Sequence, residues 1–363
     1  MKSFGVFLAE GGNVDLGDGL SADRIDMTRL NRKDFVLSIV RALRLFSKEF
    51  KATTNFRLFG SKVWTSGSTE ALFNLKGISD DDFRKHKPSV GDIDVQVDKN
   101  LQPYLTPFLG VARGKTYGDA KLLGAKESAG TSISLWQFPK YNNIKVQVDF
   151  EYVDFAKGRP TEWAKLSHSS SWQDMQQGVK GVFHKFIIQA IDARNLREVY
   201  LMSPKGKSMK KTKITNIAFS VIRGVRLKYE PVLDDKGNHM QKDGLFVYKE
   251  QSTSQSNYVT DINEMFKILF GQYPTGQDLT NFNSFTGIAE LIHKNFKRDE
   301  KAKILFGFAH SLWDTKRAQK MYRNDPNRDL AEKSIAFDIL QKLWKVKPGI
   351  DVEKMQKEYY KAY

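Results

Sequence analysis

Hydrophobic and polar positions along the chain follow two different periods. After Asn31, a candidate N-cap, apolar residues recur at helical spacing from Phe35 to Phe50, which predicts an amphipathic helix. Further on, alternating or short apolar segments predict strands. These strands are 92–97, 120–127, 131–138 and 144–152. The apolar segment Phe56–Phe59 predicts one more strand. We therefore expect a domain with a small mixed sheet over residues 31–155.

The second half of the chain changes to helical periodicity beyond the last of these strands. The spacing of apolar residues predicts a helix over 178–194, and helices prevail again from Ile262 onward. Between them, two apolar segments flank a turn of Asp, Gly and Asn residues, which predicts a β-hairpin over 225–249. Residues 156–363 are therefore expected to form a mainly helical domain with this hairpin inserted.

Two segments have no regular period. Residues 1–30 are rich in Gly and Asp and are expected to form a loosely ordered N-terminal arm. Residues 203–213 combine five lysines with Gly, Ser and Pro, and we expect a mobile basic loop. The predicted fold class is α+β: a small mixed-sheet domain followed by a mainly helical part.

Composition narrows the classes of function. The 363 residues include 58 Lys and Arg against 42 Asp and Glu, and the net charge of +16 favours a polyanionic partner such as nucleic acid, with solubility as the alternative reason. The chain has no cysteine, which excludes disulfides, thiolate nucleophiles and zinc sites built on sulfur. No apolar stretch approaches the roughly 18 residues of a membrane span. The apolar run near the N-terminus is too short for a signal peptide, so we expect a cytoplasmic protein without a membrane partner.

Three carboxylates on the predicted strands form a candidate metal site. Asp92 and Asp94 are two residues apart on one strand and so point to the same face, and Asp149 lies on a second alternating strand. Such a set can hold two divalent cations and stabilise an in-line displacement at phosphorus. An Asp-x-Asp pair alone is usually the solvent face of an edge strand, but the third carboxylate favours the metal site. Glu151 shares the face of Asp149 and is a spare candidate for the third ligand.

A Gly-Ser turn upstream is a candidate phosphate site. Gly60-Ser61 follows the predicted strand Phe56–Phe59, where glycine would allow backbone N–H groups to approach phosphate and serine would add a donor. Thirty residues separate Ser61 from Asp92. Gly67-Ser68, with Thr69 beside it, is closer to the aspartates and is the alternative. The apolar strand before Gly60 favours the first pair.

The order of these elements between Phe35 and Phe155 resembles the DNA polymerase β-like nucleotidyltransferase superfamily, which includes CCA-adding enzymes, poly(A) polymerases and antibiotic nucleotidyltransferases. The resemblance implies a palm domain that moves a nucleoside monophosphate from an NTP, such as ATP, to a hydroxyl and releases pyrophosphate. It further implies that Gly60 and Ser61 contact the β- and γ-phosphates, and that Asp92 and Asp94 ligate two Mg²⁺ ions, with Mn²⁺ as a substitute. Asp149 would ligate one ion and activate the acceptor hydroxyl. The gap between Ser61 and Asp92 is longer than is usual in the family.

Basic residues suggest where the substrates lie. Lys180 and Lys185 follow the Asp149 strand, where relatives often place a cation against the triphosphate, although surface lysines are the plainer interpretation. The lysines of the predicted basic loop are candidates to bind a nucleic-acid backbone, or are simply solvated. They are Lys205, Lys207, Lys210, Lys211 and Lys213. The positive charge favours an RNA 3′ end, such as that of tRNA, as the acceptor. A protein or small-molecule acceptor, or a non-catalytic nucleic-acid-binding protein on the same palm, is the alternative.

Overall fold

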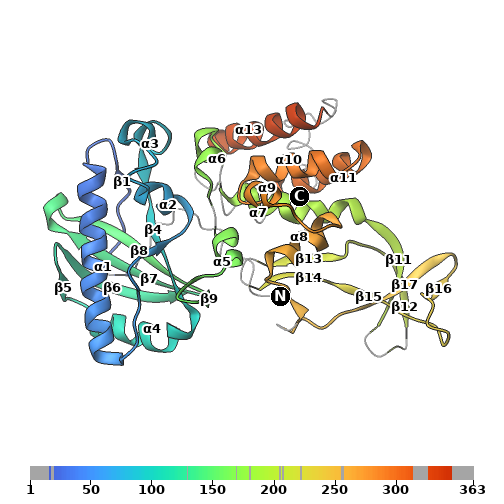
Figure 1. Ribbon diagram of the computed structural model, residues 1–363, viewed down its shortest axis with the longest axis horizontal. Coiled ribbons are helices and arrows are strands. Elements are labelled where there is room, and N and C mark those ends of the chain that lie inside the picture. The colour runs from blue at the N-terminus through green and yellow to red at the C-terminus, as the bar shows by residue number, and fades with distance from the viewer. Residues whose placement is uncertain are drawn as a thin grey trace. The chain divides into compact units, whose positions relative to one another are not determined.

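The protein forms two compact units in the computed structural model (Figure 1). The residues described are 16–17, 20–128, 130–168, 170–179, 181–203, 206, 208–220, 223–254, 257–313 and 326–345. The first unit ends at Gly181 and the second begins at Val182. The first unit therefore extends beyond the expected boundary at residue 155, because Trp172 and Met175 still pack against its core. Both units contain helices and strands, which confirms the α+β class.

The first unit is built on a six-stranded mixed sheet with the strand order β2-β4-β8-β7-β6-β5. The strands are β2 (Trp64–Thr65), β4 (Asp92–Asp98), β5 (Thr116–Tyr117), β6 (Ala120–Ser128), β7 (Thr131–Phe138) and β8 (Ile144–Val153). β4 and β8 run parallel, and every other neighbouring pair is antiparallel. The strands expected over 92–97, 120–127, 131–138 and 144–152 are confirmed, as is the mixed sheet.

One face of this sheet is covered by α1 (Arg32–Thr54) and α4 (Gln102–Val111). Asn31 caps α1, as its sequence position predicts, and its side chain accepts a hydrogen bond from the N–H of Asp34. Phe46 of α1 packs against the rings of Trp136 and Phe150 from the sheet. Because this face takes the apolar side chains of β4 and β8, their alternate polar residues point to the opposite face.

Two expectations for the N-terminal part of this unit are wrong for the residues that the structure describes, which leave out 1–15, 18 and 19. Within the predicted arm, Ile25 and Met27 are fully buried, and β1 (Ile25–Asp26) pairs with β3 (Ser89–Val90). The arm is therefore part of the core from about residue 20, where its apolar residues have a partner. The segment Phe56–Phe59 forms no strand. Only its last two side chains reach the core, and β2 takes the position beside β4 instead.

Short elements complete the first unit. They are α2 (Gly67–Phe73), α3 (Asp80–His86), β9 (Phe155–Ala156), β10 (Arg159–Pro160), α5 (Glu162–Ser167) and α6 (Trp172–Gln176). The side chain of Gln96 donates a hydrogen bond to the carbonyl of Ala164, which attaches α5 to the polar face of β4. β9 and β10 form a hairpin directly after β8.

The second unit combines helices with two sheets, so the expectation of a mainly helical part is too narrow. The strands are β11 (Arg197–Met202), β12 (Met209–Ile214), β13 (Ile217–Ser220), β14 (Gly224–Leu227), β15 (Tyr229–Pro231), β16 (Gln241–Lys242) and β17 (Leu245–Glu250). The helices are α7 (Gly181–Ala190), α8 (Ile262–Phe270), α9 (Gly276–Asn281), α10 (Phe285–Asn295), α11 (Arg298–Trp313) and α13 (Pro326–Trp344). The strands outside the expected hairpin were missed because several are short and charged, which conceals alternation.

Two predictions fall on these strands. The hairpin is confirmed in part: β15 and β17 pair antiparallel across the turn, but β14 pairs with β13. The basic loop is wrong for residues 209–213, which form β12 and pair with β11. Across the described ranges, no helix combines the length and apolar character that crossing a membrane requires.

Candidate metal and nucleotide site

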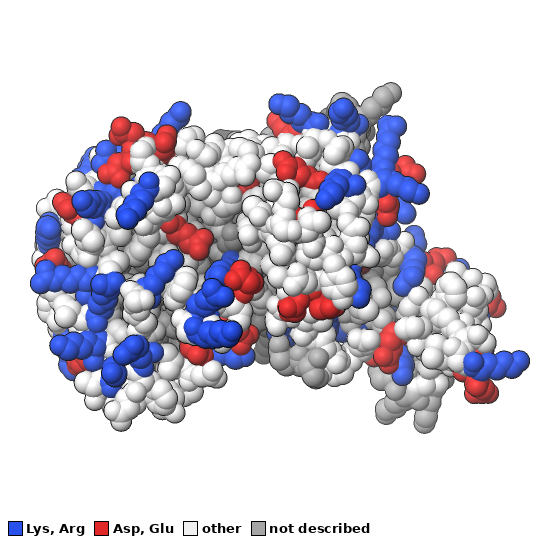
Figure 2. Space-filling model, viewed as in Figure 1, with Lys and Arg blue, Asp and Glu red and all other residues white. Residues whose placement is uncertain are grey.

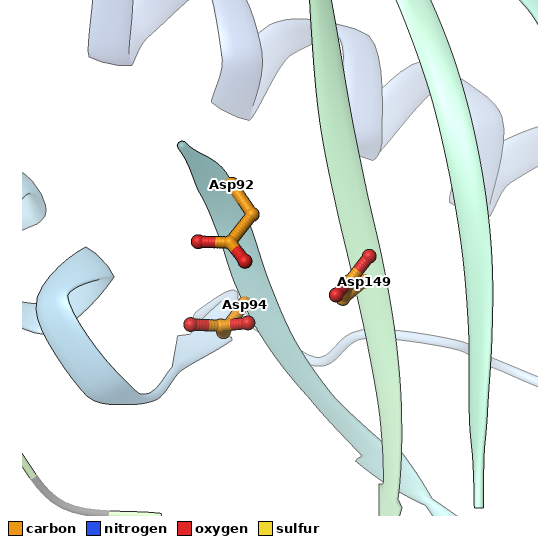
Figure 3. A group of neighbouring side chains, drawn as sticks. All are labelled: Asp92, Asp94 and Asp149. Carbon is orange, nitrogen blue, oxygen red and sulfur yellow. The ribbon is translucent and has the colours of Figure 1, made fainter. Parts of the chain in front are cut away.

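Three aspartates converge on the polar face of the mixed sheet. Asp94 and Asp149 are directly opposite each other on the parallel strands β4 and β8, and Asp92 is two residues before Asp94 (Figure 3). One carboxylate oxygen from each of the three lies within 4.8 Å of the other two, and all three residues are partly buried. All-oxygen donors of this kind suit hard divalent cations such as Mg²⁺ and Mn²⁺. The donor set therefore fits the metal that the sequence predicts.

The electrostatics of Asp149 reflect this crowding. Burial, and next the nearby carboxylate of Asp92, raise its pKa to about 8, although the side-chain amide of Gln147 opposes the shift. That amide donates to both carboxylate oxygens of Asp149, at 2.9 and 3.0 Å, and so fixes the orientation of the carboxyl group. A bound divalent cation would add positive charge beside this carboxylate and would reverse the shift.

The turn at Gly67 lies against these aspartates. The backbone N–H of Ser66 donates to the carbonyl of Asp94 at 3.3 Å, and the N–H of Asp94 donates to the hydroxyl of the buried Thr69 at 2.9 Å. Gly67 has a φ of +56°, and a Cβ there would lie 2.9 Å from a carboxylate oxygen of Asp94. Glycine is therefore favoured at this position for two reasons, its backbone angle and the lack of space for a Cβ.

A polar network fixes the same turn from the other side. Ser66 donates its hydroxyl to the carboxylate of Glu151, and Nε2 of His168 lies 3.8 Å from that carboxylate. The carbonyl of His168 accepts the N–H of Gly67 at 2.8 Å. Among the described residues, Glu151 is not one of the carboxylates that lie close enough together to hold a metal ion. The structure thus places the spare carboxylate beside the turn, where it binds Ser66.

The structure does not bring the preferred Gly60-Ser61 pair into this arrangement. Both residues are exposed, and a Cβ at Gly60 would meet no atom within 4 Å. The carbonyl of Ser61 accepts a hydrogen bond from Arg44 on α1. The alternative pair, Gly67-Ser68, is the one beside the aspartates.

None of the predicted basic residues that the structure describes lies in the first unit, which contains the aspartates. Lys180, Lys205 and Lys207 lie outside the described residues. Lys185 is on α7 of the second unit and is partly buried. On β12 of the same unit, the remaining lysines are exposed, and one of them, Lys211, pairs with Glu198 at 3.2 Å. The other two are Lys210 and Lys213.

Sequence reasoning missed Gln147, Ser66 and His168. Gln147 lies on the same strand face as Asp149, so its period-two position was a readable signal. Ser66 precedes the Gly67-Ser68 pair, which was considered and not preferred. His168 lies in a segment without regular period, and nothing in the sequence marks it. No family model matches the chain, and no curated protein matches its sequence.

Proposed function

We propose that the first unit is the palm of a metal-dependent nucleotidyltransferase, which moves a nucleoside monophosphate from an NTP to a hydroxyl. The single observation that carries this proposal is the convergence of Asp92, Asp94 and Asp149 from two neighbouring parallel strands. Two strands that differ in sequence position by about fifty residues supply one oxygen-only donor set, beside a glycine turn. Phosphoryl chemistry uses this combination of carboxylates and phosphate turn.

The three aspartates would hold one or two Mg²⁺ ions. When bound, the ions would neutralise phosphate charge and stabilise the attacking and leaving oxygens of the displacement. The carboxylate of Asp149 accepts the proton of the acceptor hydroxyl. The acceptor oxygen then forms a bond to the α-phosphorus, the bond from that phosphorus to the bridging oxygen of the β-phosphate breaks, and pyrophosphate leaves. Gln147 orients Asp149 for this step through its two hydrogen bonds.

Gly67-Ser68 replaces Gly60-Ser61 as the proposed phosphate turn. Support comes from the close approach of Gly67 to Asp94 and from its hydrogen bond to the carbonyl of His168, which fix the backbone at this point. The partly exposed Ser68 next to it offers a hydroxyl to the β- and γ-phosphates.

The proposed acceptor is the 3′ end of an RNA strand. The net charge of +16 supports a polyanionic acceptor over a small molecule or a protein. A nucleic acid gains affinity from each neutralised phosphate, whereas a neutral hydroxyl compound gains nothing from this charge.

Transfer of label tests the proposal. The purified protein is incubated with Mg²⁺ and each α-³²P-labelled NTP, together with RNA, DNA or protein, and we expect label in the RNA pool and free pyrophosphate. Asp92→Asn and Asp94→Asn should abolish transfer. Asp98→Asn is the matched control, because Asp98 lies on the same strand and face, and its cap on the N–H of Asn100 is one that asparagine also provides. Absence of label from every pool, or full transfer by Asp92→Asn, would contradict the proposal.

A further inference from the structure

Helix α1 presents a line of basic side chains to solvent. Five exposed residues, spaced by three, four and eight positions, lie along one side of the helix and are here called the basic stripe. The stripe consists of Lys33, Arg41, Arg44, Lys48 and Lys51. At about 1.5 Å per residue, it is about 27 Å long. The opposite side of α1 is buried against the sheet, so the helix is held rigidly with the stripe outward.

Few carboxylates compensate this charge. α1 contains two acidic residues, Asp34 in its first turn and Glu49, and Glu49 is paired at 2.6 Å with Lys115 from outside the helix. No residue of the basic stripe forms an ion pair with any carboxylate that the structure describes. A solvated helix usually gains stability from pairs of opposite charge three or four residues apart. In Figure 2, Lys and Arg side chains gather over the region that α1 occupies in Figure 1.

The basic stripe continues toward the aspartates through the segment after α1. Arg44 donates a hydrogen bond to the carbonyl of Ser61 at 3.1 Å, and the next residue, Lys62, places its ammonium group 4.3 Å from the ring centre of Trp64. Trp64 lies on β2, the edge strand of the sheet, and Gly67 follows shortly after. A basic and aromatic path therefore connects the outer face of α1 with the edge of the candidate site.

We propose that the basic stripe binds the sugar–phosphate backbone of the RNA strand whose 3′ end is the acceptor; this inference rests on the proposed function. A rigid line of cations is complementary to a linear polyanion. Leu37 and Leu45, which are 52% and 39% exposed beside the stripe, offer apolar surface to unpaired bases. A membrane-surface helix would insert its apolar side, but the apolar side of α1 is buried in the core.

The stripe is also a better candidate than the lysines of β12. Lys211 is paired with Glu198, and Lys213 lies directly opposite the same glutamate in the strand register. A carboxylate among these lysines lowers their attraction for phosphate. Three basic residues can be replaced on each of the two surfaces, which allows a matched comparison.

The test measures binding of a fluorescein-labelled single-stranded RNA of about 20 nucleotides by anisotropy, between about 50 and 300 mM KCl. The buffer contains EDTA and no NTP. The stripe variant is Arg41→Gln, Lys48→Gln and Lys51→Gln; Arg44 is retained because it bonds to Ser61. The matched control is Lys210→Gln, Lys211→Gln and Lys213→Gln. Glutamine keeps the helix propensity of α1, and the lysines replaced on β12 are exposed, so circular dichroism should show both variants folded.

We expect the slope of log K against log salt to become less steep by about two in the stripe variant. Three cations are replaced, and each single-strand phosphate contact contributes about 0.7 to the slope. The control should keep the slope of the unchanged protein. An unaltered slope in the stripe variant, an equal loss in both variants, or no RNA binding by the unchanged protein would overturn the proposal. Binding to phosphatidylserine vesicles that the stripe variant loses, with RNA binding retained, would overturn it in favour of a membrane surface.

Failure of the proposed chemistry remains distinguishable from failure of this inference. Asp92→Asn should bind RNA normally in EDTA, because no metal is needed there. The stripe variant should bind Mn²⁺ in calorimetry with unchanged affinity, because the stripe and the aspartates lie on opposite sides of the sheet. Loss of Mn²⁺ affinity in the stripe variant would mean that it acts through the fold and would overturn the assignment.

Discussion

Replacement of Gly67 by alanine separates the two glycine pairs that the sequence offers. Alanine at a φ of +56° costs about 1–2 kcal/mol. Its Cβ would also lie 2.9 Å from a carboxylate oxygen of Asp94, so that carboxylate must rotate away. The backbone cost alone should lower the melting temperature by about 2–8 °C for a domain of this size. Displacing the Asp94 carboxylate, a proposed metal ligand, should weaken Mn²⁺ binding by about 10–100-fold, as is usual when the support of a metal ligand is lost.

Calorimetric titration with Mn²⁺ and thermal unfolding measure the two effects separately. Gly60→Ala is the matched control, since its Cβ would meet nothing within 4 Å and its φ is not positive. This variant should change the free energy of unfolding by less than about 0.5 kcal/mol and leave Mn²⁺ affinity unchanged. If Gly67→Ala bound Mn²⁺ as tightly as the unchanged protein, or if Gly60→Ala lost the ion, the assignment of the turn would be refuted.

Three further predictions concern side chains that support this architecture. Arg32 is 1% exposed and donates to five backbone carbonyls at and after the end of α2. Arg32→Met should therefore cost about 3–5 kcal/mol in urea unfolding, and a cost below about 1 kcal/mol would contradict this. Glu151→Ala should weaken Mn²⁺ binding by about tenfold or more because Ser66 loses its partner, whereas Glu151→Gln keeps an acceptor and should bind as before; equal affinities for both variants would be the contrary result. Burial lowers the pKa of His184 to about 4, whereas the unfolded chain binds a proton there at about pH 6.5. Because the unfolded state binds this proton and the folded state does not, stability should fall by about 2 kcal/mol between pH 7 and 5. His184→Gln should remove that part of the pH dependence. If the urea midpoints of both proteins changed by the same amount between pH 7 and 5, His184 would not contribute.

Elements with a strong period could be predicted from the sequence. β8 alternates over nine residues with Val146, Val148 and Phe150 on the core side, so a single register satisfies the hydrophobic effect. The same alternation places Asp149 on the polar face, and the Asp92–Asp94 pair follows from the same rule on β4. The convergence of the three aspartates required one further fact, namely that β4 and β8 are neighbours, which no local pattern contains.

Charge was harder to interpret than hydrophobicity because exposed lysines have no required partner. Five lysines within residues 203–213 drew attention as a run, although those described lie on a strand with Glu198 opposite. The basic residues of α1 are spread over nineteen positions and form a stripe only once the helix is built. Arg32, next to the first of them, turns inward and bonds to carbonyls. Counting lysines and arginines along the sequence does not separate buried from exposed side chains. The structure of the helix shows which of them reach solvent.

The choice between Gly60 and Gly67 depended on a strand of two residues. Periodicity cannot reveal such a strand, and the apolar residues Phe56–Phe59 suggested a stronger one nearby. In the fold, Thr65 is opposite Val95, so the next residue of the chain donates its N–H to the carbonyl of Asp94. The register of β2 on β4 therefore determines which glycine meets the aspartates. A side chain on Gly67 would occupy the place of the Asp94 carboxylate, because the pairing of β2 with β4 brings the two residues together. Gly60 has open space around it and no such constraint.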